Sequence, residues 1–323
     1  MVEMGYLTEA DAPGARKNWL LEKPEKQTKK LPTTNYRLPD HFSYSQLAAF
    51  DKCPLQYKFA FILKVPTRGK AVFSFGKTMH ATLHDFLKLT NEGENKDQAD
   101  LFGFASKTSK TIKTTSTILS FKTLSDIFER NWIDEWYETK KQKNDYYKLG
   151  KKIIKEFYKE FEKKQPKVLK INNALALETP FNLKVGEHTL FGVIDRIDEK
   201  DAMPDGRQGG VVIFDYKTGT SKDKLDAQAK EQLLIYQIAA EEIFKIKPKE
   251  LIYYYLNDPS YAKSFGGQGA KKMSFIGTDK EKEELKKKII AEIEEIKKSD
   301  FSATPGWQCG YCDFRDICDW AER

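Results

Sequence analysis

Three acidic residues and one lysine could do chemistry together in this sequence. The segment "VVIFDYKTG" at 211–219 ends in Asp215 and Lys217, "FGVIDRIDE" at 191–199 carries Asp195, and "LALETP" at 175–180 carries Glu178. Residues two apart on a strand point to the same side, so Asp215 and Lys217 share a face. A salt bridge at the edge of a core is the ordinary explanation for such a pair.

The two other acids favour a metal site over that salt bridge. Asp195 follows apolar Val193 and Ile194, and Gly192 leaves room for close backbone approach. Gathered carboxylates repel each other, and a divalent cation is the simplest way to stabilise them; hard oxygen ligands suit Mg²⁺ or Mn²⁺. Such a cation polarises a phosphate and acidifies a water, while a lysine at its edge orients that water or neutralises charge in the transition state.

The elements that must position these side chains follow from the hydrophobic period. Candidate strands are expected at 171–178, 189–198, 211–217 and 251–256. Helices are expected from about Ser43 to Pro54, at about 76–90, in two stretches after Lys122, at about 225–245 and at about 279–298. This order predicts an α/β fold with a mixed central β-sheet flanked by helices.

The chain is expected to form one folded domain behind a flexible arm. Residues 1–40 are polar and show no sustained period, which is typical of a flexible N-terminal arm. Within the domain at 41–323, we expect a loop and helical insertion at 91–165, a catalytic core at 168–256 and a cysteine motif at 305–323.

Charge and hydropathy narrow the class of partner. The 323 residues carry a formal charge of +7, with a sequence pI near 8.9, and nucleic acid is the commonest anionic partner of such a chain. No apolar run approaches the roughly 20 residues that span a bilayer, and the N-terminus lacks the apolar stretch of a secretory signal. We therefore expect a cytoplasmic protein without a membrane partner.

Four cysteines indicate a second metal centre. Cys309, Cys312 and Cys318 are separated by two and then five residues, and Cys53 is the fourth. Four thiolates suit tetrahedral zinc and equally suit a [4Fe–4S] cluster, and spacing alone does not choose between them. Unliganded thiols are the third alternative.

Four motifs in order resemble the PD-(D/E)xK nucleases, in their RecB-like exonuclease branch. The branch carries Gly-x-x-x-His, matched by "GKTMH" at 76–80, and Gly-x-x-Asp-Arg-x-Asp, matched by "GVIDRID" at 192–198. It then carries Asp-x-Lys-Thr-Gly, matched by "DYKTG" at 215–219, and Gln-x-x-x-Tyr, matched by "QLLIY" at 232–236. The Pro-Asp of the family name is replaced by Ile194-Asp195. The resemblance implies a restriction-endonuclease-like core.

The resemblance also implies roles for individual residues. His80, Asp195, Asp215 and the Tyr216 carbonyl would bind Mg²⁺ or Mn²⁺, with Glu178 a possible additional acid. Lys217 would assist the attacking water, while Gln232 and Tyr236 would help place the substrate strand. The cysteines resemble the iron–sulfur staple of RecB-like nucleases, which favours a [4Fe–4S] cluster over zinc and predicts termini joined by the four cysteines.

The implied function is a metal-dependent DNA exonuclease that acts on single-stranded DNA or duplex ends beside a helicase, in DNA repair, recombination or CRISPR-type processing. Single-stranded ends are the favoured substrate. A DNA-binding module that acts beside a helicase without cleavage is the alternative. His80 and His84 in "HATLH" also superficially match a zinc protease motif, but that motif needs Glu where Ala81 stands. His84 is expected to pack beside Phe86 and Leu87 or to face solvent.

Overall fold

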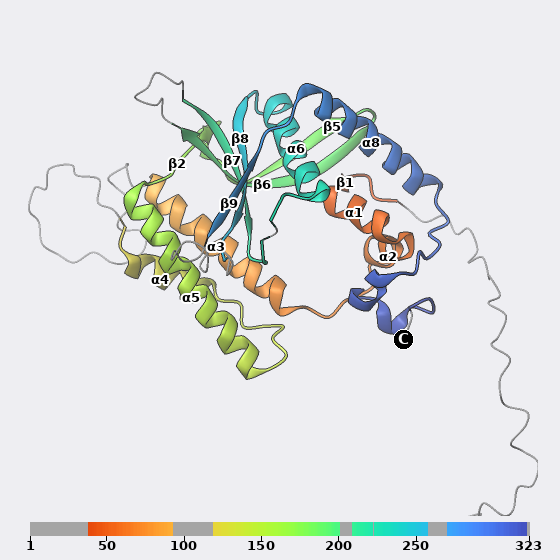
Figure 1. Ribbon diagram of the computed structural model, residues 1–323, viewed down its shortest axis with the longest axis horizontal. Coiled ribbons are helices and arrows are strands. Elements are labelled where there is room, and N and C mark those ends of the chain that lie inside the picture. Colours follow the sequence, from red (N-terminus) through yellow and green to blue (C-terminus); the bar gives the residue numbers. More distant parts are fainter. Residues whose placement is uncertain (1–37, 93–118, 201–208, 222, 258–269, 322–323) are drawn as a thin grey trace, which may run out of the picture. The chain divides into compact units, whose positions relative to one another are not determined.

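A seven-stranded mixed sheet forms the centre of the fold, in a computed structural model that describes residues 38–92, 119–200, 209–221, 223–257 and 270–321. The strand order is β1-β6-β7-β8-β9, and β2 and β5 also pair with β6. Figure 1 shows this sheet with helices on both sides. The strands are β1 (Phe42–Ser43), β2 (Lys167–Val168), β5 (Leu177–Val185), β6 (His188–Lys200), β7 (Gly210–Lys217), β8 (Pro248–Tyr255) and β9 (Lys271–Phe275).

The pairing directions follow from the connections. β5, β6 and β7 form the predicted antiparallel meander, and Gly186 closes the β5–β6 turn with a φ of 60°. β7 and β8 are parallel, which requires a crossover, and α6 (Ala227–Glu242) supplies it. The predicted mixed sheet in an α/β fold is therefore confirmed.

The expected strand at 171–178 is wrong in its position. This segment instead contains β3 (Lys170–Ile171) and β4 (Ala174–Leu175), which form a separate two-stranded sheet. Asn172 and Asn173 between them both have positive φ, 48° and 67°, as a type I′ turn requires. The strand that pairs with β6 therefore begins only at Leu177. The sequence analysis also missed β1 and β9.

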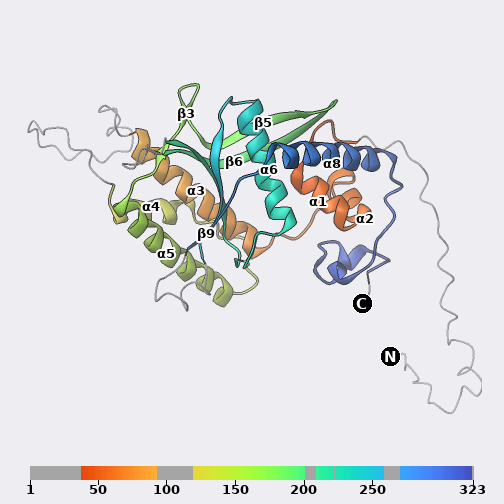
Figure 2. The ribbon, with the colours of Figure 1, turned by 45° about the horizontal axis from the view of Figure 1, so that its top comes forward.

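Two groups of helices cover the two faces of the sheet. Neighbouring tyrosines of β8 show this: the Tyr253 hydroxyl donates to Gln232 of α6, whereas the Tyr254 hydroxyl donates to Glu160 of α5, at 3.0 Å. Figure 2 shows α3 and α6 on opposite sides of the strands. The helices on the α5 side are α3 (Ala71–Glu92), α4 (Phe121–Asn131) and α5 (Lys140–Lys163).

The last long helix, α8 (Asp279–Lys298), packs on α6 and confirms its predicted apolar stripe. Leu285, Ile289, Ile293 and Ile296 are all buried. The helix begins at a capping box, in which Thr278 and Glu281 satisfy each other's backbone N–H groups.

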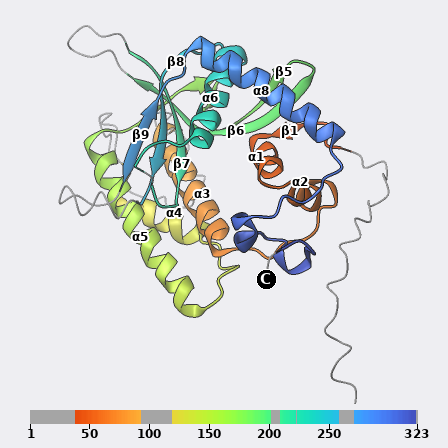
Figure 3. The same cartoon turned by 45° about the vertical axis from the view of Figure 1, so that its right-hand side comes forward.

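The two ends of the described domain meet. Cys53 ends α1 (Tyr44–Lys52) and precedes α2 (Pro54–Tyr57), as expected, and a π-helical turn, Lys58–Ile62, follows. The C-terminal turns Trp307–Tyr311 and Arg315–Ile317 lie beside this region (Figure 3). Thr304 Oγ1 and Gln308 Nε2 donate to the Lys52 carbonyl at 3.1 and 3.3 Å.

A cross-strand contact explains Gly192 and gives a test of the sheet. Gly192 pairs with Phe181 of β5, and a Cβ at Gly192 would lie 2.3 Å from the Phe181 ring. Gly192→Ala should therefore destabilise the fold by about 1–3 kcal/mol through overpacking, measured as a lower denaturation midpoint. Gly219→Ala is the matched control because no atom lies within 4 Å of its Cβ position. Equal midpoints for the two variants would contradict this packing.

Candidate active site

The strand register places two acids side by side. β6 and β7 pair Arg196 with Phe214, so Asp195 lies beside Asp215 on the face of the sheet that α6 covers. Asp215 is only 2% exposed. The backbone N–H of Tyr216 donates to Asp195 Oδ2 at 2.6 Å, which compensates part of the cost of burying that carboxylate.

His80 of α3 joins these acids from a different layer. Its Nδ1 lies 3.4 Å from Glu178 Oε1 and 3.6 Å from Asp195 Oδ1, and its Nε2 lies 3.2 Å from the Tyr216 carbonyl. Glu178, the second residue of β5, has a left-handed φ of 46°. One ligand atom from each of His80, Glu178 and Asp195 lies within 4.8 Å of the others. This donor set of nitrogen and carboxylate oxygen could hold Mg²⁺ or Mn²⁺.

The charges of the group shift its pKa values in a consistent way. Burial alone lowers the pKa of His80, but the hydrogen bond to Glu178 and the charges of Asp195, Glu178 and Asp215 outweigh it and raise that pKa to about 9. Burial, followed by repulsion from Asp215, raises the pKa of Asp195 to about 7. The protein thus gathers more negative charge than it can neutralise, as expected for a cation site.

Asp215 belongs to a second, adjoining set of contacts. Its Oδ2 lies 2.6 Å from Lys217 Nζ, so the salt bridge considered from the sequence is present. Its Oδ1 accepts from Gln232 Nε2 at 3.1 Å and from the Tyr236 hydroxyl at 3.2 Å. Asp215 therefore stands outside the His80 group, and its role as a metal ligand stays a prediction, as do the other assigned roles.

One cleft of about 1070 Å³ collects both sets. The predicted residues that line it are His80, Glu178, Asp195, Asp215, Tyr216, Lys217, Gln232 and Tyr236. The sequence analysis missed Tyr253, whose hydroxyl donates to Gln232. Its signal was the polar run "YYY" in a strand that is buried on both faces.

His84 does not take part in the His80 group. Its Nδ1 lies 3.0 Å from Asp85 Oδ1, whereas His80 turns to Glu178, Asp195 and Tyr216. The arrangement gives no support to a His80–His84 zinc site.

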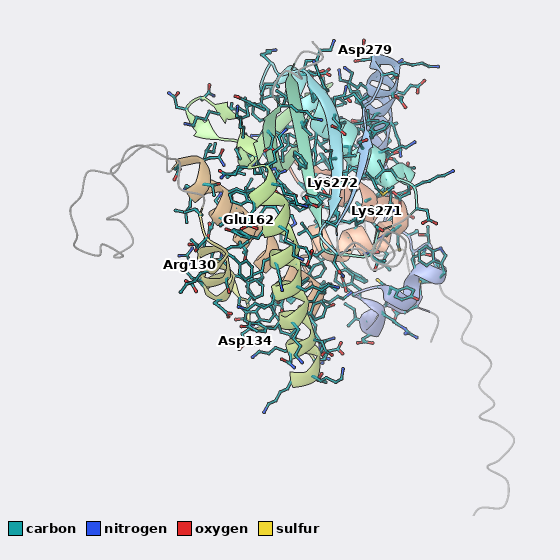
Figure 4. The ribbon with its side chains drawn as sticks, turned by 60° about the vertical axis from the view of Figure 1, so that its left-hand side comes forward. Arg130, Asp134, Glu162, Lys271, Lys272 and Asp279 are labelled. Carbon is teal, nitrogen blue, oxygen red and sulfur yellow. The ribbon has the colours of Figure 1, made fainter. Side chains whose placement is uncertain are left out.

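The remaining charged residues of "GVIDRID" face the opposite side of the sheet. Arg196 Nη1 donates to the Tyr216 hydroxyl at 2.5 Å, and Arg196 Nε lies 3.1 Å from Asp198 Oδ1. Both residues line a cavity of about 300 Å³ between α5 and the sheet. Lys272, labelled in Figure 4, also lines this cavity and forms an ion pair with Glu160 of α5. Arg196 therefore supports the active face from behind through Tyr216.

The four cysteines lie around one small cavity between α2 and the C-terminal turns. Cys53, Cys309, Cys312 and Cys318 all line it. Over the described parts of the chain, no three of their sulfur atoms lie within 4.8 Å of one another. Four thiolates on one zinc ion would lie about 3.8 Å apart, given a Zn–S bond of about 2.3 Å and tetrahedral geometry.

Comparison with known proteins identifies the class. The profile of the PD-(D/E)XK nuclease superfamily matches residues 41–319, and the chain belongs to this superfamily. A stretch of 100 residues, 28% of this chain, is 34% identical to part of an ATP-dependent helicase/nuclease from Ligilactobacillus salivarius (strain UCC118). That stretch spans only 8% of the length of the helicase/nuclease polypeptide.

A solved structure titled "Crystal structure of SSO0001" also matches, with 14% identity and a TM-score of 0.36, and the match covers 89% of each chain. Among the helices whose placement the structure describes, none has the length and apolar character needed to cross a membrane.

The ligand group predicts which substitution weakens metal binding. Asp195→Asn removes a carboxylate shared by His80 and the Tyr216 N–H, so Mn²⁺ affinity measured by calorimetry should fall at least tenfold. Glu199→Gln, an exposed change on the same strand, should leave the affinity unchanged. Equal affinities for the two variants would place the cation elsewhere.

Proposed function

We propose that this superfamily member is a metal-dependent DNA nuclease that hydrolyses phosphodiester bonds, acting as an exonuclease on single-stranded DNA ends. The observation that carries the proposal is the juxtaposition of two sets in one cleft. His80, Glu178 and Asp195 offer ligands for a cation, and Lys217 lies against Asp215 beside them. A module that only binds DNA has no use for buried acids opposite its phosphate ligand.

The chain's own residues would share the work of hydrolysis. Bound Mg²⁺ or Mn²⁺ would polarise the phosphate and lower the pKa of a water. Lys217 would orient that water and offset developing negative charge on the phosphate. Gln232 Oε1 lies 3.4 Å from Lys217 Nζ and Gln232 Nε2 lies 2.9 Å from the Tyr236 hydroxyl, so the two residues of α6 would hold Lys217 and Asp215 in register with the substrate strand.

The single-stranded substrate and the setting rest on resemblance. The motifs match the RecB-like exonuclease branch, and the similarity to an ATP-dependent helicase/nuclease supports a helicase as partner. We place the activity in DNA repair, recombination or CRISPR-type processing in the cytoplasm.

A [4Fe–4S] cluster is the proposed occupant of the cysteine cavity. The four cysteines that line one cavity support a shared centre. Their wide sulfur spacing favours a cluster, in which iron atoms stand between the thiolates, over a single zinc ion. Its role would be structural, because it would join the helix end at Cys53 to the C-terminal turns.

Lys217→Ala tests the nuclease mechanism. It should lower the rate of Mg²⁺- or Mn²⁺-dependent cleavage by about 10²–10³-fold, as expected for a lost electrostatic contact in the transition state, while metal affinity stays unchanged. The assay uses oligonucleotides labelled at either end, with a circular strand as the control for exonuclease action. Lys230→Ala, an exposed lysine on α6, is the matched variant. Normal turnover in Lys217→Ala, or rapid cleavage of the circle, would contradict the mechanism or the exonuclease class respectively.

Cys53→Ser tests the cysteine centre. Because structural metal sites contribute folding energy directly, the variant should lose iron and melt at a lower temperature when purified anaerobically. Wild-type protein should be brown, with broad absorbance near about 400 nm. A colourless protein with one zinc per chain would establish zinc, and full iron in Cys53→Ser would show that Cys53 is not a ligand.

A further inference from the structure

Large apolar side chains are exposed at the wall of the catalytic cleft. Trp136, Phe73 and Val72 are 42%, 52% and 51% exposed, and all three line the same cleft as the acids. A single exposed apolar residue needs no explanation. Two aromatic rings beside a predicted phosphate-cleaving centre do need one, because they are not required by the chemistry of hydrolysis.

The loop that carries Trp136 is held firmly. It connects α4 to α5 and is tied to α3, where the Ser74 hydroxyl donates to the Glu135 carbonyl at 2.7 Å. The N–H of Ile133 donates to Thr78 Oγ1 at 3.1 Å. Ser74 and Thr78 are fully buried. The position of Trp136 is therefore set by the same helix that presents His80.

The ring of Trp136 is placed in the cleft at a conformational cost. Trp136 has a φ of 67°, in the left-handed region that a bulky residue rarely adopts. The indole lies directly against the backbone of Gly69, where a Cβ would come within 1.9 Å of the ring. Only glycine fits at position 69, so the strained backbone and this glycine together keep the ring at the cleft wall.

A cation stands next to the ring. Lys77 Nζ lies 5.3 Å from the centre of the Trp136 ring, and Lys77 is exposed on the same cleft wall. A flexible lysine beside an aromatic ring matches the two components of single-strand recognition, which are charge for the backbone and a flat apolar face for a base.

We propose that Trp136 and Phe73 form a stacking platform for unpaired bases of the strand whose phosphate enters the acid centre, with Lys77 on its backbone. The inference rests on the proposed nuclease function and adds the device that selects a single strand. Unpaired bases offer their faces to aromatic rings, whereas the bases of a duplex are already stacked on each other. A docked protein would not need a phosphate-binding lysine or the adjacent acids.

Binding without catalysis tests the platform. Fluorescence anisotropy of a labelled oligodeoxythymidylate and of a duplex of equal length is measured with divalent cation left out. Trp136→Ala should weaken single-strand binding by roughly 5- to 150-fold, the loss expected for one base–aromatic stack, and duplex binding should change little. Phe73→Ala should act in the same direction. Phe121→Ala, an aromatic 36% exposed at the start of α4 outside the cleft, should have no effect.

Two further variants separate stacking from loop folding. Trp136→Phe keeps an aromatic face and should retain most of the affinity, whereas Trp136→Gly relieves the left-handed φ and should bind as weakly as Trp136→Ala. Unchanged single-strand affinity in a folded Trp136→Gly protein would overturn the platform. Equal weakening of single-strand and duplex binding would also overturn it.

The outcome does not depend on cleavage. A wild-type protein that binds single strands through Trp136 but hydrolyses none with Mg²⁺ or Mn²⁺ would refute the nuclease mechanism and leave the platform established.

Discussion

The repulsion between Asp195 and Asp215 is the constraint on which the rest of the structure depends. Two buried carboxylates side by side cost free energy, and the fold answers them from several directions. α3 brings His80, β7 brings the Tyr216 N–H and Lys217, and α6 brings Gln232 and Tyr236. Both helical layers are therefore needed to hold the charge at the ends of two neighbouring strands.

Tyr216 connects this centre to the opposite side of the sheet. Its backbone serves Asp195 and His80 on the active face, while its hydroxyl accepts from Arg196 behind the sheet. The Arg196 guanidinium in turn lies 3.9 Å from the centre of the Phe214 ring. The Asp-Arg pair of the sequence thus divides its work between two faces, with one residue exposed to chemistry and the next fixing the strand that supports it.

Short-range patterns made much of this predictable. Strand alternation placed Asp215 with Lys217, and a period of 3.6 placed the buried stripe of α8, because neighbours along an element decide both. Distant contacts were not readable. The position of Glu178 depended on the turn at Asn172 and Asn173, and β9 became recognisable only through its pairing with β8. The setting of Trp136 depends on Gly69, far away in the sequence.

The burial of α6 on nearly all sides has a consequence for the evolution of the chain. Every residue from Leu233 to Ala240 is buried, since the helix lies between the sheet and α8, and such a helix is apolar around its whole circumference. Substitutions in α6 are therefore constrained by packing on every side, even where they face away from the cleft. Sequence drift in this family member has room on the charged outer sides of α5 and α8, and adaptation to new substrates is more accessible through the cleft wall formed by α3 and the Trp136 loop.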